Sequence, residues 1–449
     1  MNARSEQPSP PPPKKESQLP APTTISALDD ELIREIFLRL PSLPTLVRAA
    51  FTCQGFLGAV HSCPAFRRRF RELNPPPILG VFIGIGDDYV LGDVAPTFTP
   101  VRRRSDPDHA AAIRGVDVLL TGLPDSGVNN DEDDYKEDDD DDGYKEDDDE
   151  DDYTEEDNYK EHNDGDRPEW CMLECRDGYA LLINGHTEEV AVYDPLTGAL
   201  HLFPVPSYEV YDEGQVDFHV FSFEEDHESF RVVCVSSDVE SAAVLSRDDR
   251  EWEIFPLDED EGGHYWPHEG TPVNGSVYRA FADGYHVCVL NITTPQFFRI
   301  YLPPDIAGTD NFKVGETKDG NLCLVSASKL RLVVWVWRAG DDGINRWMLE
   351  NTYRLRSAHK IPQHSSEDYL VGKFATYLKL KVVGIIGGIV YLSGYSCADS
   401  GYWFLSFCLE KEELNKLCRI TKSIFSYPYI MAWPNSLVHN KVNLQLEGA

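Results

Sequence analysis

The sequence has few basic residues for its length. Its 449 residues include 41 Lys or Arg against 77 Asp or Glu, which gives a formal net charge of −36. A chain of this charge repels a phosphate backbone, so the composition argues against a nucleic-acid-binding protein. Two short basic runs, at residues 67–71 and 102–104, are interpreted as solvated surface.

The sequence also lacks a long apolar run. The longest nearly uncharged stretch, from Val382 to Gly394, has 13 residues and includes four glycines. A membrane-spanning helix needs about 20 predominantly apolar residues. We therefore expect no membrane-spanning segment and no membrane partner. The N-terminal residues lack the apolar stretch of a secretory signal.

Motifs of metal binding and catalysis are missing as well. The ten cysteines form no CxxC pair, and Cys171 and Cys175 have no second pair at zinc spacing. This pattern favours reduced thiols in a cytoplasmic or nuclear protein over a metal site. No HExxH, GxSxG or GxxxxGK[ST] motif occurs. Because His264, His268 and His286 are separated by loop-like sequence, we interpret them as polar turn and edge-strand residues, and we predict no catalytic residue and no cofactor.

Two segments have compositions typical of disorder. Residues 1–22 are rich in Pro, Ser, Lys and Gln, and they cannot bury enough apolar surface to offset the entropy of ordering. Residues 131–166 carry 23 acids against three lysines, in an imperfect nine-residue repeat that begins at Tyr135, Tyr144 and Tyr153. We predict a disordered arm at 1–22, a solvated acidic insertion at 125–168 and a tail at 441–449. The acidic repeat lacks the glycine and ordered acceptors of a calcium loop.

Residues 24–72 have the pattern of a small helical unit. The first predicted helix has Ser26 as its N-cap and ends at Pro41. The second begins near Pro44, and Pro64 opens a fourth. The apolar positions are Leu28, Leu32, Ile33, Ile36, Phe37 and Leu40 in the first helix, Leu46, Val47, Ala50 and Phe51 in the second, and Phe56, Leu57 and Val60 in the third. A unit of about 45 residues has only a marginal core, so we expect it to pack against the rest of the chain or against a partner protein.

After Asn74 the pattern changes to short β-branched runs separated by Gly, Asp, Asn and Pro. About nineteen strands are expected, including one at 116–120, and only Leu409 to Leu417 looks helical. Such a series is too long for one sandwich, and repeated turn-then-strand units are typical of a β-propeller. We predict an all-β domain at 76–440, interrupted by the acidic insertion. The repeat is too irregular to fix the number of blades.

The segment from Ile25 to Phe56 resembles the F-box. The resemblance is carried by Leu32-Ile33, Glu35-Ile36, Leu38-Arg39-Leu40-Pro41 and Leu46-Val47-Arg48-Ala49. Two positions depart from the family pattern, because Asp29 stands where Pro is usual and Phe56 where Trp is usual. The resemblance implies docking on a Skp-type adaptor, which joins the chain to the cullin and RING subunits of a ubiquitin ligase. The adaptor-binding residues that it implies are Leu28, Asp29, Leu32, Ile33, Ile36, Leu40, Pro41, Leu46 and Val47.

The physical pattern agrees with that implication. The helical unit has more apolar surface than its small core can hide, and a groove on a partner would cover the surplus. The alternative is that these side chains only pack the unit's own core or its junction with the β domain.

The β region resembles the propeller-type domains that follow the F-box in large plant families, most clearly from Tyr427 to Leu437. This resemblance implies a platform that recruits a target protein, whose identity and binding face the sequence does not give. The leading hypothesis is a non-catalytic receptor that raises the rate of ubiquitination through proximity. The alternative is a propeller hydrolase or glycan-binding module for which the helical unit is only a cap.

Overall fold

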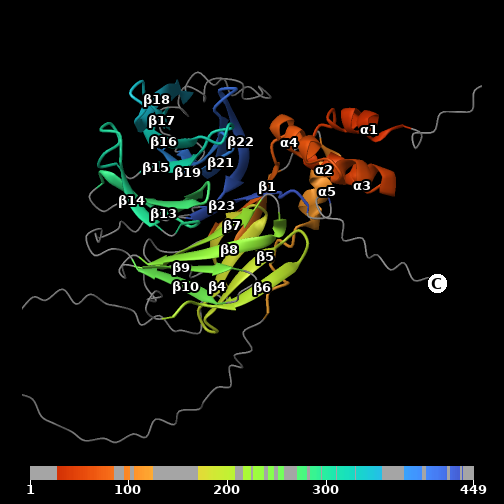
Figure 1. Ribbon diagram of the computed structural model, residues 1–449, viewed down its shortest axis with the longest axis horizontal. Coiled ribbons are helices and arrows are strands. Elements are labelled where there is room, and N and C mark those ends of the chain that lie inside the picture. Colours follow the sequence, from red (N-terminus) through yellow and green to blue (C-terminus); the bar gives the residue numbers. More distant parts are fainter. Residues whose placement is uncertain are drawn as a thin grey trace, which may run out of the picture. The chain divides into compact units, whose positions relative to one another are not determined.

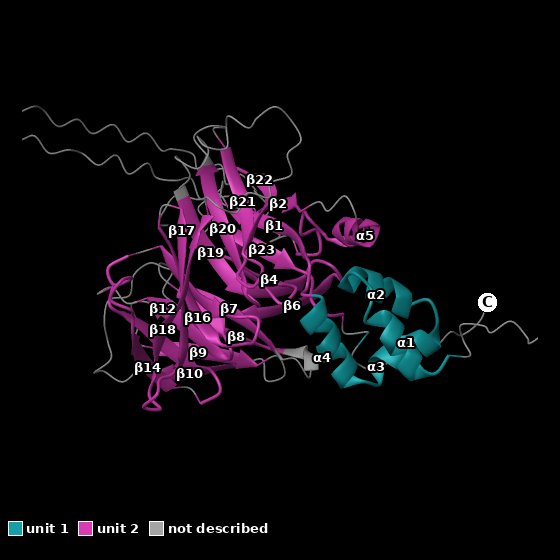
Figure 2. Ribbon diagram, turned by 90° about the horizontal axis from the view of Figure 1, so that it is seen from above, with its two compact units in different colours: residues 1–74, 436–449 teal, residues 75–435 magenta. Residues whose placement is uncertain are grey.

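A computed structural model describes residues 28–84, 96–101, 106–124, 170–207, 216–223, 226–236, 241–246, 251–256, 270–280, 284–294, 296–309, 311–328, 330–355, 379–396, 401–421, 425–434 and 437. The chain divides into two compact units, residues 1–74 with 436–449 and residues 75–435, which Figure 2 colours separately. The predicted arm, acidic insertion and tail all lie outside the described residues. Within those residues, no helix is both long and apolar enough to cross a membrane.

The described part of the first unit contains four short helices, as the sequence predicted. They are α1 (Asp30–Phe37), α2 (Leu43–Ala50), α3 (Gln54–His61) and α4 (Pro64–Leu73). Prolines occupy the first turns of α2 and α4, where their missing N–H costs no helical hydrogen bond.

The predicted ends of the first helix were wrong. Its N-cap is Asp29 rather than Ser26, because the Asp29 carboxylate accepts the backbone N–H of Leu32 at 2.8 Å. The helix ends at Phe37, several residues before Pro41, and the backbone N–H of Leu40 then bonds the carbonyl of Phe37 in a tighter turn.

The second unit consists of six antiparallel sheets and one helix, α5 (Pro107–Gly115), in its described part. One sheet has three strands in the order β2-β1-β23, and the other five each have four strands in sequence order. The strands are β1 (Ile78–Gly84), β2 (Thr97–Pro100), β3 (Cys171–Arg176), β4 (Tyr179–Asn184), β5 (Glu189–Asp194), β6 (Ala199–Pro204), β7 (Val216–Phe223), β8 (Asp226–Ser236), β9 (Ser241–Ser246), β10 (Trp252–Pro256), β11 (Thr271–Val273), β12 (Ser276–Ala280), β13 (His286–Asn291), β14 (Gln296–Tyr301), β15 (Phe312–Glu316), β16 (Leu322–Ser328), β17 (Arg331–Ala339), β18 (Asn345–Arg354), β19 (Lys379–Ile386), β20 (Ile389–Ser396), β21 (Gly401–Cys408), β22 (Glu413–Ile420) and β23 (Phe425–Ile430).

The six sheets are the blades of a propeller. The first strand of each four-stranded blade contacts that of the next, from β3 through β7, β11 and β15 to β19, and β23 contacts β3. Figure 1 shows several of the blades, with β7, β15, β19 and β23 labelled. β23 also pairs with β1, with Val81 opposite Pro428, so the last strand completes a sheet that the first strand began. This pairing closes the ring and leaves no blade without neighbours. The propeller prediction is confirmed, and the structure adds the number of blades.

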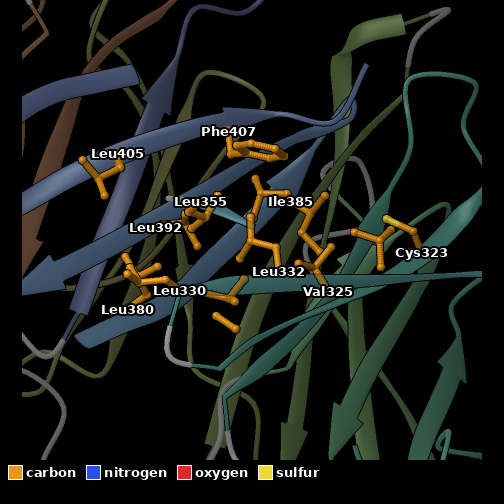
Figure 3. Close-up of a cluster of buried hydrophobic side chains, with 14 of the residues drawn as sticks. Cys323, Val325, Leu330, Leu332, Leu355, Leu380, Ile385, Leu392, Leu405 and Phe407 are labelled. Carbon is orange, nitrogen blue, oxygen red and sulfur yellow. The ribbon is translucent and has the colours of Figure 1, made fainter. Parts of the chain in front are cut away.

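Apolar side chains between adjacent blades form the core. Figure 3 shows one such cluster, in which Val325 and Leu332 of one blade meet Leu392 and Phe407 of the next. All four are almost fully buried. Burial of apolar surface contributes roughly 25 cal/mol per Å², so these contacts hold neighbouring blades together.

Two predictions for the β region were wrong. Residues 116–120 form a turn after α5 instead of a strand, because the Asp117 carboxylate accepts the hydroxyl of Thr121 and the backbone N–H of Gly122. Residues 409–417 do not form a helix, because from Glu413 they are β22, the outer strand of its blade.

Candidate functional site

Helix α1 presents an apolar stripe to solvent. Leu32 and Ile36, four residues apart on the same helix face, are 51% and 48% exposed. Ile33 and Phe37 are buried. Helix α1 has eight residues and carries apolar side chains on two faces. The face with Ile33 and Phe37 packs inside this chain, and the face with Leu32 and Ile36 does not. This stripe is the candidate partner-binding site.

Two side chains of α1, Arg34 and Phe37, hold it against α3 and the residue that follows α3. The guanidinium of Arg34 donates to the carbonyl of Ala59 at 2.8 Å and to the hydroxyl of Ser62 at 3.0 Å. The rings of Phe37 and Phe56 meet edge to face, with centroids 5.4 Å apart. These contacts hold the exposed stripe on a rigid support.

A second arginine, Arg67, hydrogen-bonds the carbonyl groups at the C-terminal end of α3. Arg67 donates to the carbonyl oxygens of Val60, at 3.3 Å, and His61. The last carbonyls of a helix have no partner within it, so these bonds and the bond from Arg34 satisfy them. Partial burial, followed by the nearby charge of Arg71, lowers the pKa of Arg67 from its ordinary value. Arg67 therefore has a structural role, whereas Arg68 and Arg69 are exposed as the sequence suggested.

The structure separates the nine predicted adaptor-binding residues into three groups. The exposed residues are Asp29, Leu32, Ile36 and Pro41. The half-buried residues are Leu28, Leu40 and Val47. Ile33 and Leu46 are buried in this chain, so a partner cannot reach their side chains and we assign them to the core.

Sequence reasoning missed two other exposed apolar residues of the first unit. Phe51, predicted as part of the apolar face of the second helix, lies just beyond the end of α2 and is 52% exposed. Leu73, in the last turn of α4, is also exposed. A more accurate prediction of where α2 ends would have shown that Phe51 falls outside the helical repeat.

The propeller contains partly buried carboxylates, close to the buried side chains of His219 and Arg279, that link its blades. The Glu174 carboxylate lies 3.5 Å from Nδ1 of His219 and accepts the backbone N–H of Val220 at 2.9 Å. In the next junction, Asp217 lies 3.2 Å from Arg279 and accepts the N–H of Gly270 at 2.9 Å. These bonds connect three consecutive blades, so their geometry supports a structural role.

Two of the propeller's described thiols, those of Cys175 and Cys234, are buried. Burial raises the pKa of the Cys175 and Cys234 thiols well above the ordinary value, which suppresses the nucleophilic thiolate. His286 packs against the ring of Tyr301, with centroids 4.2 Å apart, while His264 and His268 lie outside the described residues. Among the residues that the structure describes, no three His, Cys, Asp or Glu side chains are placed to hold a metal ion.

Comparison with known families decides the classification. The pattern of the family described as "F-box protein AT5G49610-like, beta-propeller" matches residues 171–437, which is more than half of the chain. The chain belongs to this family. The match covers five blades and the closing strand, and no curated protein matches the sequence.

Solved structures overlap this F-box protein only loosely. The chain aligns with "Dihydro-heme d1 dehydrogenase NirN in complex with DHE" at 13% identity and a TM-score of 0.29, over 60% of this chain and 67% of the other. A structure from a study of two prolyl endopeptidases aligns at 13% identity and a TM-score of 0.30, over 54% of this chain and 42% of the other. A luciferin-regenerating enzyme aligns at 10% identity and a TM-score of 0.30, over 56% of this chain and 74% of the other. Overlaps at these scores carry no argument about activity.

The two departures from the F-box pattern have local explanations. Asp29 replaces the usual Pro and caps α1 through its carboxylate, so the helix still has a defined start. Phe56 replaces the usual Trp and packs edge-on against Phe37, so an aromatic ring still joins α1 to α3. Both substitutions preserve the support of the exposed stripe.

Proposed function

We propose that this F-box protein is the substrate receptor of a Skp–cullin–F-box type of ubiquitin ligase. The F-box helices bind a Skp-type adaptor, and through it the cullin and RING subunits. The propeller binds the target protein and holds it near the ubiquitin-conjugating enzyme. In this role the chain contributes proximity and orientation, and no residue of its own takes part in bond making.

The observation that carries the proposal is the exposure of Leu32 and Ile36 on α1. Two large aliphatic side chains at i and i+4 are the anchors with which an amphipathic helix enters an apolar groove. Leu28 and Leu40 lie half-buried before and after them, and Pro41 is exposed. Further accessible apolar side chains therefore occur directly before α1 and shortly after it in the sequence.

The proposal also includes the compartment. Seven of the described cysteines are free thiols, namely Cys53, Cys63, Cys175, Cys234, Cys323, Cys408 and Cys418. Unpaired cysteines are typical of proteins that work in reducing surroundings. We therefore place the receptor in the cytoplasm, the nucleus or both.

The test is copurification of a Skp-type adaptor with the full chain. Leu32→Asp combined with Ile36→Asp places two charges on the stripe while sparing the buried Ile33 and Phe37. Adaptor recovery should fall at least about tenfold, because a groove that receives apolar anchors rejects unpaired charge.

The matched control is Leu119→Asp combined with Leu349→Asp. Both leucines are exposed on the propeller unit, so the control introduces the same two charges on an exposed surface elsewhere. This control should bind the adaptor as the unmodified chain does. Undiminished adaptor recovery with the α1 variant would overturn the proposal, and so would hydrolytic or glycan-binding activity that accounts for the chain without an adaptor.

A further inference from the structure

Lysine and arginine are distributed very differently along this chain. Residues 16–135 contain 11 arginines and residues 161–312 contain seven, but neither stretch contains a lysine. The rest of the chain has seven arginines and all 16 lysines. Because arginine is present in both stretches, they lack lysine specifically and not positive charge. We call them the lysine-free stretches.

The lysine-free stretches include most of the described elements. They contain the four described helices of the first unit, α5, β1, β2 and the three blades that begin with β3, β7 and β11. The second stretch ends at Phe312, the first residue of β15. The two blades that begin with β15 and β19 are neighbours, since β15 contacts β19. These two blades hold every lysine of the described residues, namely Lys313, Lys318, Lys379, Lys381, Lys411 and Lys416.

Some arginines of the lysine-free stretches have structural roles that lysine fills poorly. The guanidinium of Arg34 donates to Ala59 and to Ser62 at the same time. Arg279 is buried, with its Nε 3.2 Å from the carboxylate of Asp217. A planar guanidinium with several donors suits such positions better than a compact ammonium. Packing and hydrogen bonding therefore account for arginine at these positions.

The exposed arginines have no such explanation. Arg68 lies on α4 and Arg114 in the last turn of α5, and both are exposed. At an exposed position, lysine supplies the same positive charge at neutral pH. Lys411 is exposed in this way in the turn between β21 and β22. Folding therefore does not dictate arginine at the exposed positions, and a chemical difference between the two side chains must account for it.

The relevant difference is that the lysine amine is a nucleophile that accepts ubiquitin, whereas the guanidinium of arginine stays protonated. In ubiquitin transfer, the neutral ε-amine attacks the thioester carbonyl that joins ubiquitin to the cysteine of a conjugating enzyme. An amide bond forms as the carbon–sulfur bond breaks, the cysteine leaves as a thiolate, and the amine gives up a proton. A surface with arginine in place of lysine keeps its charge and offers no side-chain amine to this reaction.

We propose that the lysine-free stretches make up the parts of the receptor that a ubiquitin-charged conjugating enzyme reaches, and that the β15 and β19 blades lie beyond its reach. Among the described residues, the receptor then offers that enzyme no acceptor of its own, and ubiquitin passes to lysines of the target. This inference rests on the proposed function, because it requires that the chain is held beside such an enzyme.

The experiment reconstitutes the ligase from the full chain, a Skp-type adaptor, cullin and RING subunits and a ubiquitin-charged conjugating enzyme, without a target. Arg68→Lys and Arg114→Lys are each compared with the unmodified chain, because both positions are exposed and both exchanges keep the charge. Each introduced lysine should accept ubiquitin and raise the total attached to the receptor at least about threefold. Tryptic peptides that retain a diglycine remnant at residue 68 or 114 identify the acceptor by mass spectrometry.

The matched control is Arg331→Lys, the same exchange at an exposed residue of β17 in the β15 blade. It should add no acceptor and leave the total unchanged. Absence of ubiquitin from residue 68 or from residue 114 would overturn the inference, and so would equal modification of residue 331.

Adaptor recovery is measured in the same samples, so the two proposals can fail separately. An unmodified chain that recovers no adaptor would overturn the proposed function and this inference with it. An assembled ligase that leaves the introduced lysines at residues 68 and 114 unmodified would overturn only the inference.

Discussion

The indole N–H of Trp170 donates to the carbonyl oxygen of Pro124 at 2.9 Å, although 46 positions of sequence separate the two residues. The acidic tract lies between them in the sequence. Trp170 is buried directly before β3, so this bond joins the chain on either side of the tract at one place in the propeller unit. The blade that begins at β3 is therefore held to the preceding segment by a contact that does not involve the tract.

Deletion of residues 131–166 should leave the melting temperature within about 2 °C of the full chain. The sequence of this tract predicts a solvated loop, and each halving of a loop changes its closure free energy by only about 0.6 kcal/mol. Differential scanning calorimetry of the two proteins measures the effect. A fall of about 10 °C or more would mean that the acidic tract packs on the propeller and is structural.

Gly315→Ala should destabilise the propeller. A Cβ at this position of β15 would lie 2.4 Å from Cβ and 2.6 Å from the carbonyl oxygen of Ile385 on β19. The backbone would have to move at the junction of two blades, at a cost of about 1–3 kcal/mol. Thermal unfolding should report the loss.

The matched control for that substitution is Gly384→Ala on β19, where no neighbouring atom lies within 4 Å of an added Cβ. It should leave the melting temperature nearly unchanged. Equal melting temperatures for Gly315→Ala and the unmodified chain would contradict the close approach of β15 and β19.

Most strands could be predicted because alternation and turn residues are local signals. β9, β13 and β15 have the bounds that their β-branched runs suggest. β22 was missed because the charged residues 410–413 have a high helix propensity. The pairing of β22 as the outer strand of its sheet overrides that local preference. The number of blades depends on the pairing of β1 with β23, and no local pattern encodes a contact between opposite ends of a domain.

The candidate site was predictable to a similar degree. The periodicity of the first helix identified Leu32 and Ile36 correctly as apolar positions, but it could not tell which face the chain itself would cover. The answer depends on Arg34 and Phe56, which orient α1 on α3 and so place Ile33 inside and Leu32 outside.

Tyr193 should make stability fall at alkaline pH. Burial, together with the hydrogen bond that its hydroxyl donates to Asp117 at 2.7 Å, raises the pKa of Tyr193 to about 12. The unfolded chain has a tyrosine pKa of about 10. Because the folded-state pKa is the higher one, this contribution is fully present below about pH 10 and is lost as the pH rises toward about 12.

Tyr193→Phe provides the comparison for this effect. It removes the hydroxyl and should cost about 1 kcal/mol near neutral pH, because Asp117 loses one hydrogen bond. The difference in melting temperature between the two proteins should then shrink as the pH rises from about 10 to about 12. A difference that stays constant over this interval would show that Tyr193 does not titrate as the structure implies.

The central claim is that the exposed stripe of α1 is covered by an adaptor. The most direct measurement is hydrogen–deuterium exchange of the full chain with and without a purified Skp-type adaptor. We predict that amide exchange around Leu32 and Ile36 slows at least about tenfold on adaptor binding, while exchange along the outer strand β18 stays the same. An adaptor that leaves exchange in α1 unchanged, or that protects only the propeller, would contradict the account.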